Sequence, residues 1–119
     1  MDGNELLKRA MALYGEIDTS DEDNRTLAVP QINMLLAEVF EVNNRMREHA
    51  GKEKLEAVPE ISSLSDTIEC EDKLLRLALP YGLAAMLYFG EEDNDGRLSM
   101  FKQEYAERVN QCDRWVVAF

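Results

Sequence analysis

The sequence predicts an all-α protein, a bundle of about four helices with a long ordered loop between helices 2 and 3. Apolar residues recur at intervals of three and four residues in separate segments, which is the spacing of helices that bury one face. The chain is 31% charged and has only three prolines, a composition that favours helices over a sandwich or barrel. Because 119 residues suffice for one hydrophobic core, we expect a single helical domain over residues 1–119.

The first predicted helix covers residues 4–15. Asn4 can cap its N-terminus and Gly15 can end it. Its apolar residues recur at helical spacing, and they are Leu6, Leu7, Ala10, Met11 and Tyr14. The polar and acidic residues 18–24 then predict a loop.

The second predicted helix covers most of residues 26–48, and Gly51 marks its end. One apolar stripe opposite a polar side indicates a buried face. The stripe consists of Ile32, Leu35, Leu36, Val39, Phe40 and Met46. Pro30 leaves two alternatives: it lies in the first turn, where its missing N–H costs nothing, or the helix begins earlier and is kinked there.

The connection formed by residues 52–69 has no regular apolar period, which predicts an extended and ordered segment. Three of its apolar side chains, Val58, Ile61 and Leu64, can serve as anchors. Loops of this length are often functional. We therefore expect this segment to contribute to contacts with other subunits.

The third predicted helix begins near Leu74 and is the most apolar segment of the chain, so it should lie at the centre of the fold. Pro80 removes one backbone hydrogen bond, and Gly82 lets a neighbouring backbone approach closely. These two residues predict a kink near residues 79–82. The acidic residues 90–96 should end this helix in a turn.

The fourth predicted helix follows the acidic turn and should pack on the third helix through one apolar stripe. That stripe contains Leu98, Phe101, Tyr105 and Val109. Residues 115–119 are then five consecutive apolar residues, which need a partner surface. Together with the long loop they define a candidate subunit interface. Its residues are Val58, Ile61, Leu64, Trp115, Val117 and Phe119.

The charge balance argues against several classes of partner. Twenty-four acidic and 13 basic residues give a net charge of −11, which repels nucleic-acid phosphates and anionic lipid surfaces. We therefore expect no sequence-specific nucleic-acid binding and no membrane association. The start of the chain lacks the pattern of a signal peptide, and Cys70 and Cys112 form no disulfide framework, which together predict a cytoplasmic protein.

The acidic turn could be interpreted as a calcium site, because Glu91, Asp93 and Asp95 would occupy positions 1, 3 and 5 of an EF-hand-like loop. Position 12 of such a loop must supply a bidentate Glu, and here it is Lys102. A cation at that place opposes metal binding. We therefore expect a helix connection whose acids favour the N-terminus of the next helix, and no metal.

The sequence does not favour an enzyme. His49 is the only histidine, so no multi-histidine metal site can form, and a Cys–His dyad is the remaining possibility. Cys70 and Cys112 have acidic neighbours, which raise a thiol pKa and make it a poor nucleophile. Neither of the two common glycine-rich phosphate-binding motifs occurs. We expect no catalytic residues and no cofactor.

Several segments together resemble small head–tail connector (adaptor) proteins of tailed bacteriophages and prophages. The resemblance covers residues 26–109. It consists of Ile32-Asn33, Leu36-Ala37-Glu38-Val39-Phe40 with Asn43, the run from Ile61 to Ile68, Leu79-Pro80-Tyr81-Gly82-Leu83-Ala84-Ala85, the acidic turn, and Phe101-x-x-x-Tyr105. It implies a structural subunit of a particle, in the host cytoplasm or in the virion.

The resemblance also implies a homo-oligomer, a ring between portal and tail, that contacts other virion proteins. An acidic channel wall would suit that position, because it does not bind the phosphates of passing DNA. No catalytic residue is implied. The alternative is an acidic adaptor or inhibitor that binds a basic partner, which predicts a monomer or dimer with salt-sensitive association.

Overall fold

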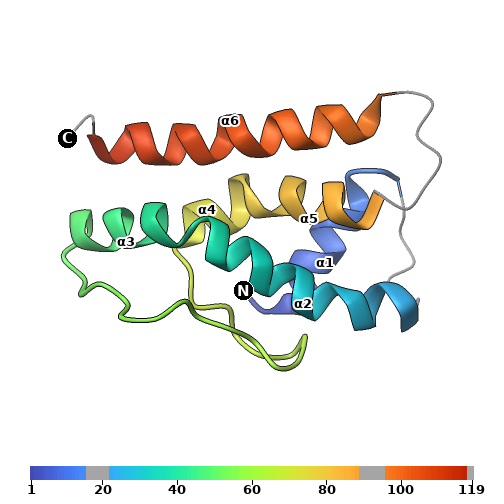
Figure 1. The fold of residues 1–119 in the computed structure, drawn as a ribbon, viewed down its shortest axis with the longest axis horizontal. Coiled ribbons are helices and arrows are strands. Elements are labelled where there is room, and N and C mark those ends of the chain that lie inside the picture. Colours follow the sequence, from blue (N-terminus) through green and yellow to red (C-terminus); the bar gives the residue numbers. More distant parts are fainter. Residues whose placement is uncertain (16–21, 89–95, 118–119) are drawn as a thin grey trace.

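The computed structural model describes residues 1–15, 22–88 and 96–117. Within these residues the chain forms six α-helices and no strand (Figure 1). The prediction of an all-α protein is confirmed. The helices are α1 Gly3–Ala12, α2 Glu22–Glu38, α3 Phe40–His49, α4 Asp72–Leu77, α5 Leu79–Tyr88 and α6 Arg97–Val117. The second and third predicted helices are each present as two helices in succession.

The second predicted helix is divided at Val39 into α2 and α3. Val39 has φ −96° and ψ 9°, outside the helical range, yet its N–H still donates to the Leu35 carbonyl at 3.0 Å. The Asn43 N–H likewise donates to the Val39 carbonyl at 2.8 Å. The division is therefore a local distortion. Pro30 lies inside α2, which begins at Glu22, so the proline does not mark the start of this helix.

The third predicted helix is divided at Ala78, and this division changes the interpretation of Pro80. Pro80 is the second residue of α5, where a helix has no internal acceptor for the missing N–H. It therefore helps to begin α5 and does not kink the middle of a helix. Ala78 has φ −109° and ψ −49°, and its carbonyl accepts from the Gly82 N–H at 3.3 Å.

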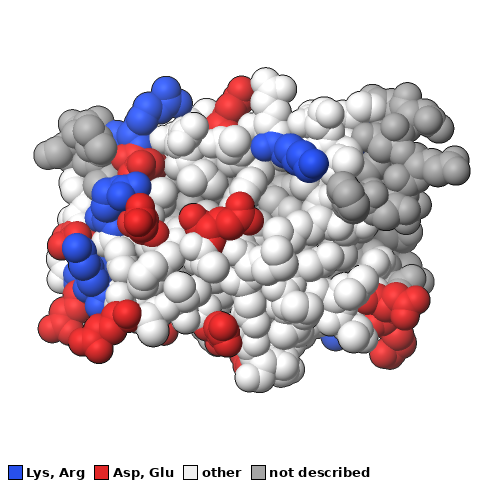
Figure 2. All heavy atoms as spheres, viewed as in Figure 1, with Lys and Arg blue, Asp and Glu red and all other residues white. Residues whose placement is uncertain are grey.

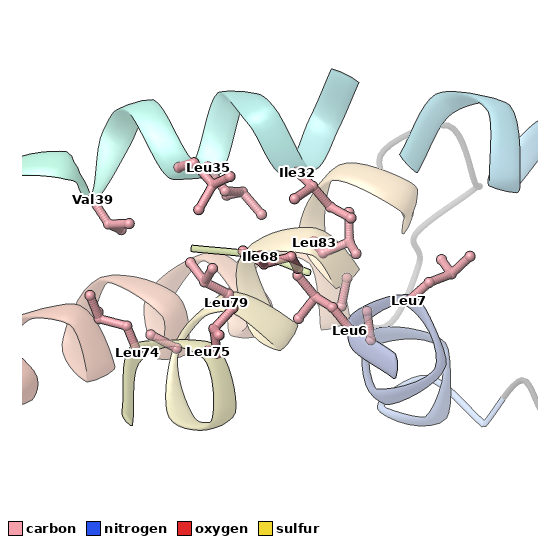
Figure 3. Close-up of a cluster of buried hydrophobic side chains, with 14 of the residues drawn as sticks. Leu6, Leu7, Ile32, Leu35, Val39, Ile68, Leu74, Leu75, Leu79 and Leu83 are labelled. Atoms are coloured by element: carbon pink, nitrogen blue, oxygen red, sulfur yellow. The ribbon is translucent and has the colours of Figure 1, made fainter. Parts of the chain in front are cut away.

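Helix α5 is the centre of the fold. It packs against α1, α2, α4 and α6, and its side chains Leu79 and Leu83 are fully buried. Figure 3 shows Ile32 and Leu35 of α2 pointing towards these leucines, with Leu6 of α1 close to Leu83. The sequence prediction that the most apolar helix lies at the centre is confirmed.

Helix α6 extends along one side of the molecule (Figure 1). Phe101 and Cys112 are buried in the core, and Tyr105 and Val109 pack against it partly buried, as the apolar stripe predicts. A bidentate contact ties this helix to α3, since Arg45 Nε and Nη2 donate to the two carboxylate oxygens of Asp113 at 2.7 and 2.9 Å. Within the described residues no helix is both long and apolar enough to cross a membrane.

The connection between α3 and α4 contains no helix over residues 51–71, and three asparagines hold it against the helices. Asn33 of α2 pairs with both backbone groups of Ile61, and Asn44 of α3 pairs with both backbone groups of Leu55. Asn43 Oδ1 accepts from the Glu71 N–H at 2.9 Å. These side chains supply hydrogen bonds that a helix or sheet would otherwise provide.

Candidate protein-interaction surfaces

The structure separates the residues of the predicted subunit interface. Val58 is 37% exposed and remains accessible to a partner. Ile61 and Leu64 are only 4% and 6% exposed, because both belong to the protomer's own core. That part of the prediction is corrected here: neither side chain lies on the surface of this protomer.

The C-terminal part of the predicted interface is only partly described. Residues Trp115 and Val117 lie in the last turn of α6, but their side chains are outside the described part of the chain, as is Phe119 altogether. Their role in subunit contacts stays a prediction.

Backbone contacts explain why the two loop anchors are buried. The Ile61 N–H donates to Asn33 Oδ1 at 2.8 Å, and Asn33 Nδ2 donates back to the Ile61 carbonyl at 3.0 Å. At the next anchor, the Asn4 N–H donates to the Leu64 carbonyl at 2.9 Å. Gly3 allows this approach, since a Cβ on it would lie 3.0 Å from the Leu64 Cα. The start of α1 and the loop therefore pack backbone to backbone.

An apolar groove between α2, α5 and α6 is the feature that sequence analysis did not find. It has a volume of about 390 Å³. Its lining residues come from three helices, and they are Gln31, Met34, Leu35, Glu38, Gly82, Ala85, Met86, Lys102 and Tyr105. Figure 2 shows that the face over α2 and between α2 and α6 is largely uncharged. Most of the lining is apolar, and it is open to solvent on one side.

Gly82 brings the three helices together beneath this groove. A Cβ on Gly82 would lie 2.8 Å from Leu35 Cδ2 and 2.9 Å from the Tyr105 ring, so only glycine fits without movement of these side chains. The neighbouring lining residue on α5, Ala85, is also small. Helix α5 therefore contributes Gly82, Ala85 and Met86 to the lining, and side chains of α2 and α6 pack closely against Gly82.

The α2 side of the groove exposes large apolar side chains. Leu27 and Met34 are 52% and 59% exposed, and with Gln31 and Glu38 they share one face of α2 at helical spacing. Methionine adapts its shape to a partner more readily than branched residues do, and methionines are common on surfaces that bind helices. An exposed apolar face of this kind is typical of a protein-interaction surface.

Two polar groups of α2 accompany the apolar lining. Gln31 Oε1 is buried without a hydrogen-bond partner, the one such side-chain atom in the described part of the chain. Glu38 is exposed and forms no ion pair with any residue that the structure describes. Burial raises the pKa of Tyr105, and the nearby Glu38 carboxylate raises it further. The lining therefore combines an apolar surface with one acidic residue, Glu38, and one basic residue, Lys102.

The two cysteines provide no reactive centre at this surface. Burial, together with the Glu71 carboxylate, raises the pKa of Cys70 to about 12, and burial also raises the pKa of Cys112. Since the thiolate is the nucleophile, we expect a thiol-specific disulfide reagent at pH 8 to label native protein slowly and guanidinium-unfolded protein completely. Equal labelling rates in native and in unfolded protein would contradict this prediction.

The raised pKa of Cys70 also lowers the free energy of unfolding as the pH rises from about 9 to about 12.

The predicted acidic turn lies mostly outside the described residues. This applies to Glu91, Asp93 and Asp95, so their arrangement is not described. Lys102, which argued against a calcium loop, is found in the lining of the groove. In the part of the chain that is described, no three His, Cys, Asp or Glu side chains form a metal-binding group.

The resemblance to connector proteins stays a prediction from the sequence. Comparison with protein-family models, with curated proteins and with solved structures finds no match to this chain.

Proposed function

We propose that this protein is an assembly subunit that acts through protein–protein contacts, in a head–tail connector-like position of a tailed phage or prophage particle. The observation that carries the assembly role is the open apolar groove, with Met34 and Leu27 exposed beside it. Exposed apolar surface of this extent is costly for an isolated chain and useful in an interface. The connector position is supported by the sequence resemblance over residues 26–109.

The rigid support of the loop favours the same role. Residues 51–71 are held by Asn33, Asn43 and Asn44, and Val58 of this segment lies on the surface. A surface that is ordered before binding loses less conformational entropy when a partner arrives. Such pre-organisation suits repeated contacts between identical subunits.

The solution mass of the purified protein tests this function. We expect light scattering after size-exclusion chromatography to give a multiple of the 13.6 kDa protomer, because Trp115 and Val58 contact neighbouring subunits. Salt should strengthen the oligomer, since it screens repulsion between subunits that each carry a charge of −11.

Variants of α6 sharpen the mass measurement. Trp115→Ala should weaken the oligomer without loss of helix content in far-UV circular dichroism. Gln111→Ala, at an exposed position of the same helix, should leave it unchanged. A wild-type protein that is monomeric at every concentration and salt level would overturn the oligomer.

The second candidate is an acidic adaptor or inhibitor that binds a basic partner. The net charge of −11 favours it, as does Glu38, which lines an apolar groove and forms no ion pair with any described residue. This function predicts a monomer or dimer whose complex weakens as salt is added, the reverse of the salt response of a homo-oligomer. The two salt responses separate the candidates.

A further inference from the structure

We propose that the groove between α2, α5 and α6 binds the apolar face of an amphipathic, basic helix from a partner protein, because its mainly apolar lining includes the exposed Met34 and also Glu38, which forms no ion pair among the described residues. This inference deepens the proposed assembly function by naming a class of partner. The inference rests on the proposed function only in that both require a protein partner. The groove and the homo-oligomer can therefore fail independently.

The shape of the groove suits a helical segment. Gly82 lets Leu35 of α2 and Tyr105 of α6 approach α5 closely, and Met34 lines the α2 side of the groove. A volume of about 390 Å³ lies at the low end of ligand-binding pockets, so it accepts a few large side chains and not a folded domain. Helices dock in such grooves by inserting apolar residues spaced three and four apart.

The charges decide which helix fits. Glu38 of α2 is exposed and has no ion pair among the described residues, so a lysine or arginine of the partner can pair with it. Lys102 lines the groove from α6. Two further acidic residues, Glu22 and Asp23, occupy the first turn of α2.

A second copy of this chain is a poorer occupant than a basic partner. Each copy carries a net charge of −11, so the approach of another copy to this face is opposed at long range. A basic helix is attracted by the same field. Gln31 also favours a polar donor on the occupant, since its Oε1 has no hydrogen-bond partner and a rotated amide could accept from the partner.

A designed peptide provides the test. We would label a 14-residue helix that carries leucines on one face and lysines on the other, and measure its binding to the full chain by fluorescence anisotropy. The comparison peptides are a scrambled sequence of the same composition and a version with glutamate in place of lysine. We expect the amphipathic basic peptide to bind at least about tenfold more tightly than either comparison peptide. Equal binding of the scrambled peptide would overturn the proposal, because it would show charge attraction without a groove.

Matched methionine variants locate the site. Met34→Asn should weaken binding of the basic amphipathic peptide by about tenfold, while Met100→Asn should change it by less than about twofold. Met100 is 47% exposed on α6 but does not line the groove, so both variants remove an exposed methionine from a helix. Glu38→Gln should weaken binding mainly at low salt. Equal effects of the two methionine variants would overturn the proposal.

The solution mass of the same samples separates the two proposals. A monomeric wild type that binds the peptide with the expected variant pattern would support the groove and overturn the homo-oligomer. An oligomer whose mass falls in Met34→Asn and not in Met100→Asn would show that a second copy occupies the groove, which overturns the basic partner. An oligomer without any Met34 effect on peptide binding would overturn the groove as a binding site and leave the homo-oligomer standing.

Discussion

Phe101→Ala is expected to lower the free energy of unfolding by about 3–5 kcal/mol, the usual cost of removing a buried aromatic side chain. Phe101 is fully buried on α6, where that long helix meets the core. Its ring also contacts Tyr14 beyond the end of α1, with the centroids 6.4 Å apart and the planes inclined by 55°. The substitution therefore leaves a cavity where α6 contacts both the core and the segment that follows α1.

A loss of this size is serious because single domains are stable by only about 5–15 kcal/mol. The ion pair between Arg45 and Asp113 also holds α6, but it is exposed and contributes about 1 kcal/mol at most after solvent screening. It cannot replace the lost packing. We expect α6 to open more readily than the remaining helices.

Urea unfolding, followed by far-UV circular dichroism, measures this effect. The adjacent Met100→Ala is the control, because Met100 is exposed and its truncation should change stability by no more than about 0.5 kcal/mol. Similar losses in the two variants would show that the burial of Phe101 does not hold α6 in place.

The helical class could be predicted because it depends on local patterns. Apolar spacing identified the helices, and Gly51 identified the end of α3 correctly. Gly51 has φ +80°, its N–H donates to the Glu48 carbonyl, and the Lys52 N–H donates to the Arg47 carbonyl at 2.8 Å. This is the Schellman arrangement, in which a left-handed residue ends a helix and glycine is favoured. All the residues involved are neighbours in sequence.

The divisions at Val39 and Ala78 could not be predicted in the same way. Neither residue breaks helices by its own conformational preference, and hydrogen bonds continue across both positions. Pro80 gave the only local signal, but a proline permits either a kink or a new helix start. The choice of a start at α5 depends on how the preceding helix packs.

Burial of the loop and formation of the groove depend on residues that are distant in sequence. Ile61 is held by Asn33, which is 28 residues away, and no period in the loop reports that pairing. The groove combines Met34, Gly82 and Tyr105 from three helices. Within its own helix, none of these three residues is distinguished from an ordinary core or surface residue by the sequence. Only the packing of α2 and α6 on α5 makes them one surface.

Asn33→Leu is expected to release the centre of the loop. Leucine is close to asparagine in size but cannot pair with the Ile61 N–H and carbonyl, so both groups lose their partner. Each group left buried without a hydrogen bond costs about 1–3 kcal/mol. The measurement is hydrogen–deuterium exchange by mass spectrometry. In the variant, residues 51–71 should exchange faster than they do in the wild type, while exchange of α5 should change less. Asn110→Leu, at an exposed site on α6, is the control.

Asn33→Asp separates the two hydrogen bonds of this clamp. The carboxylate can still accept from the Ile61 N–H, but it has no N–H to donate to the Ile61 carbonyl and places a negative charge beside it. Because the added charge repels the carbonyl, exchange at the loop should be faster than in wild type at pH 7. This difference from wild type, measured at the same pH, should become smaller at a pH low enough to protonate the aspartate. Protection at pH 7 equal to that of wild type would show that the loop is held by its buried side chains alone. In that case Ile61 and Leu64, and not the asparagines, would be what presents Val58 to a partner.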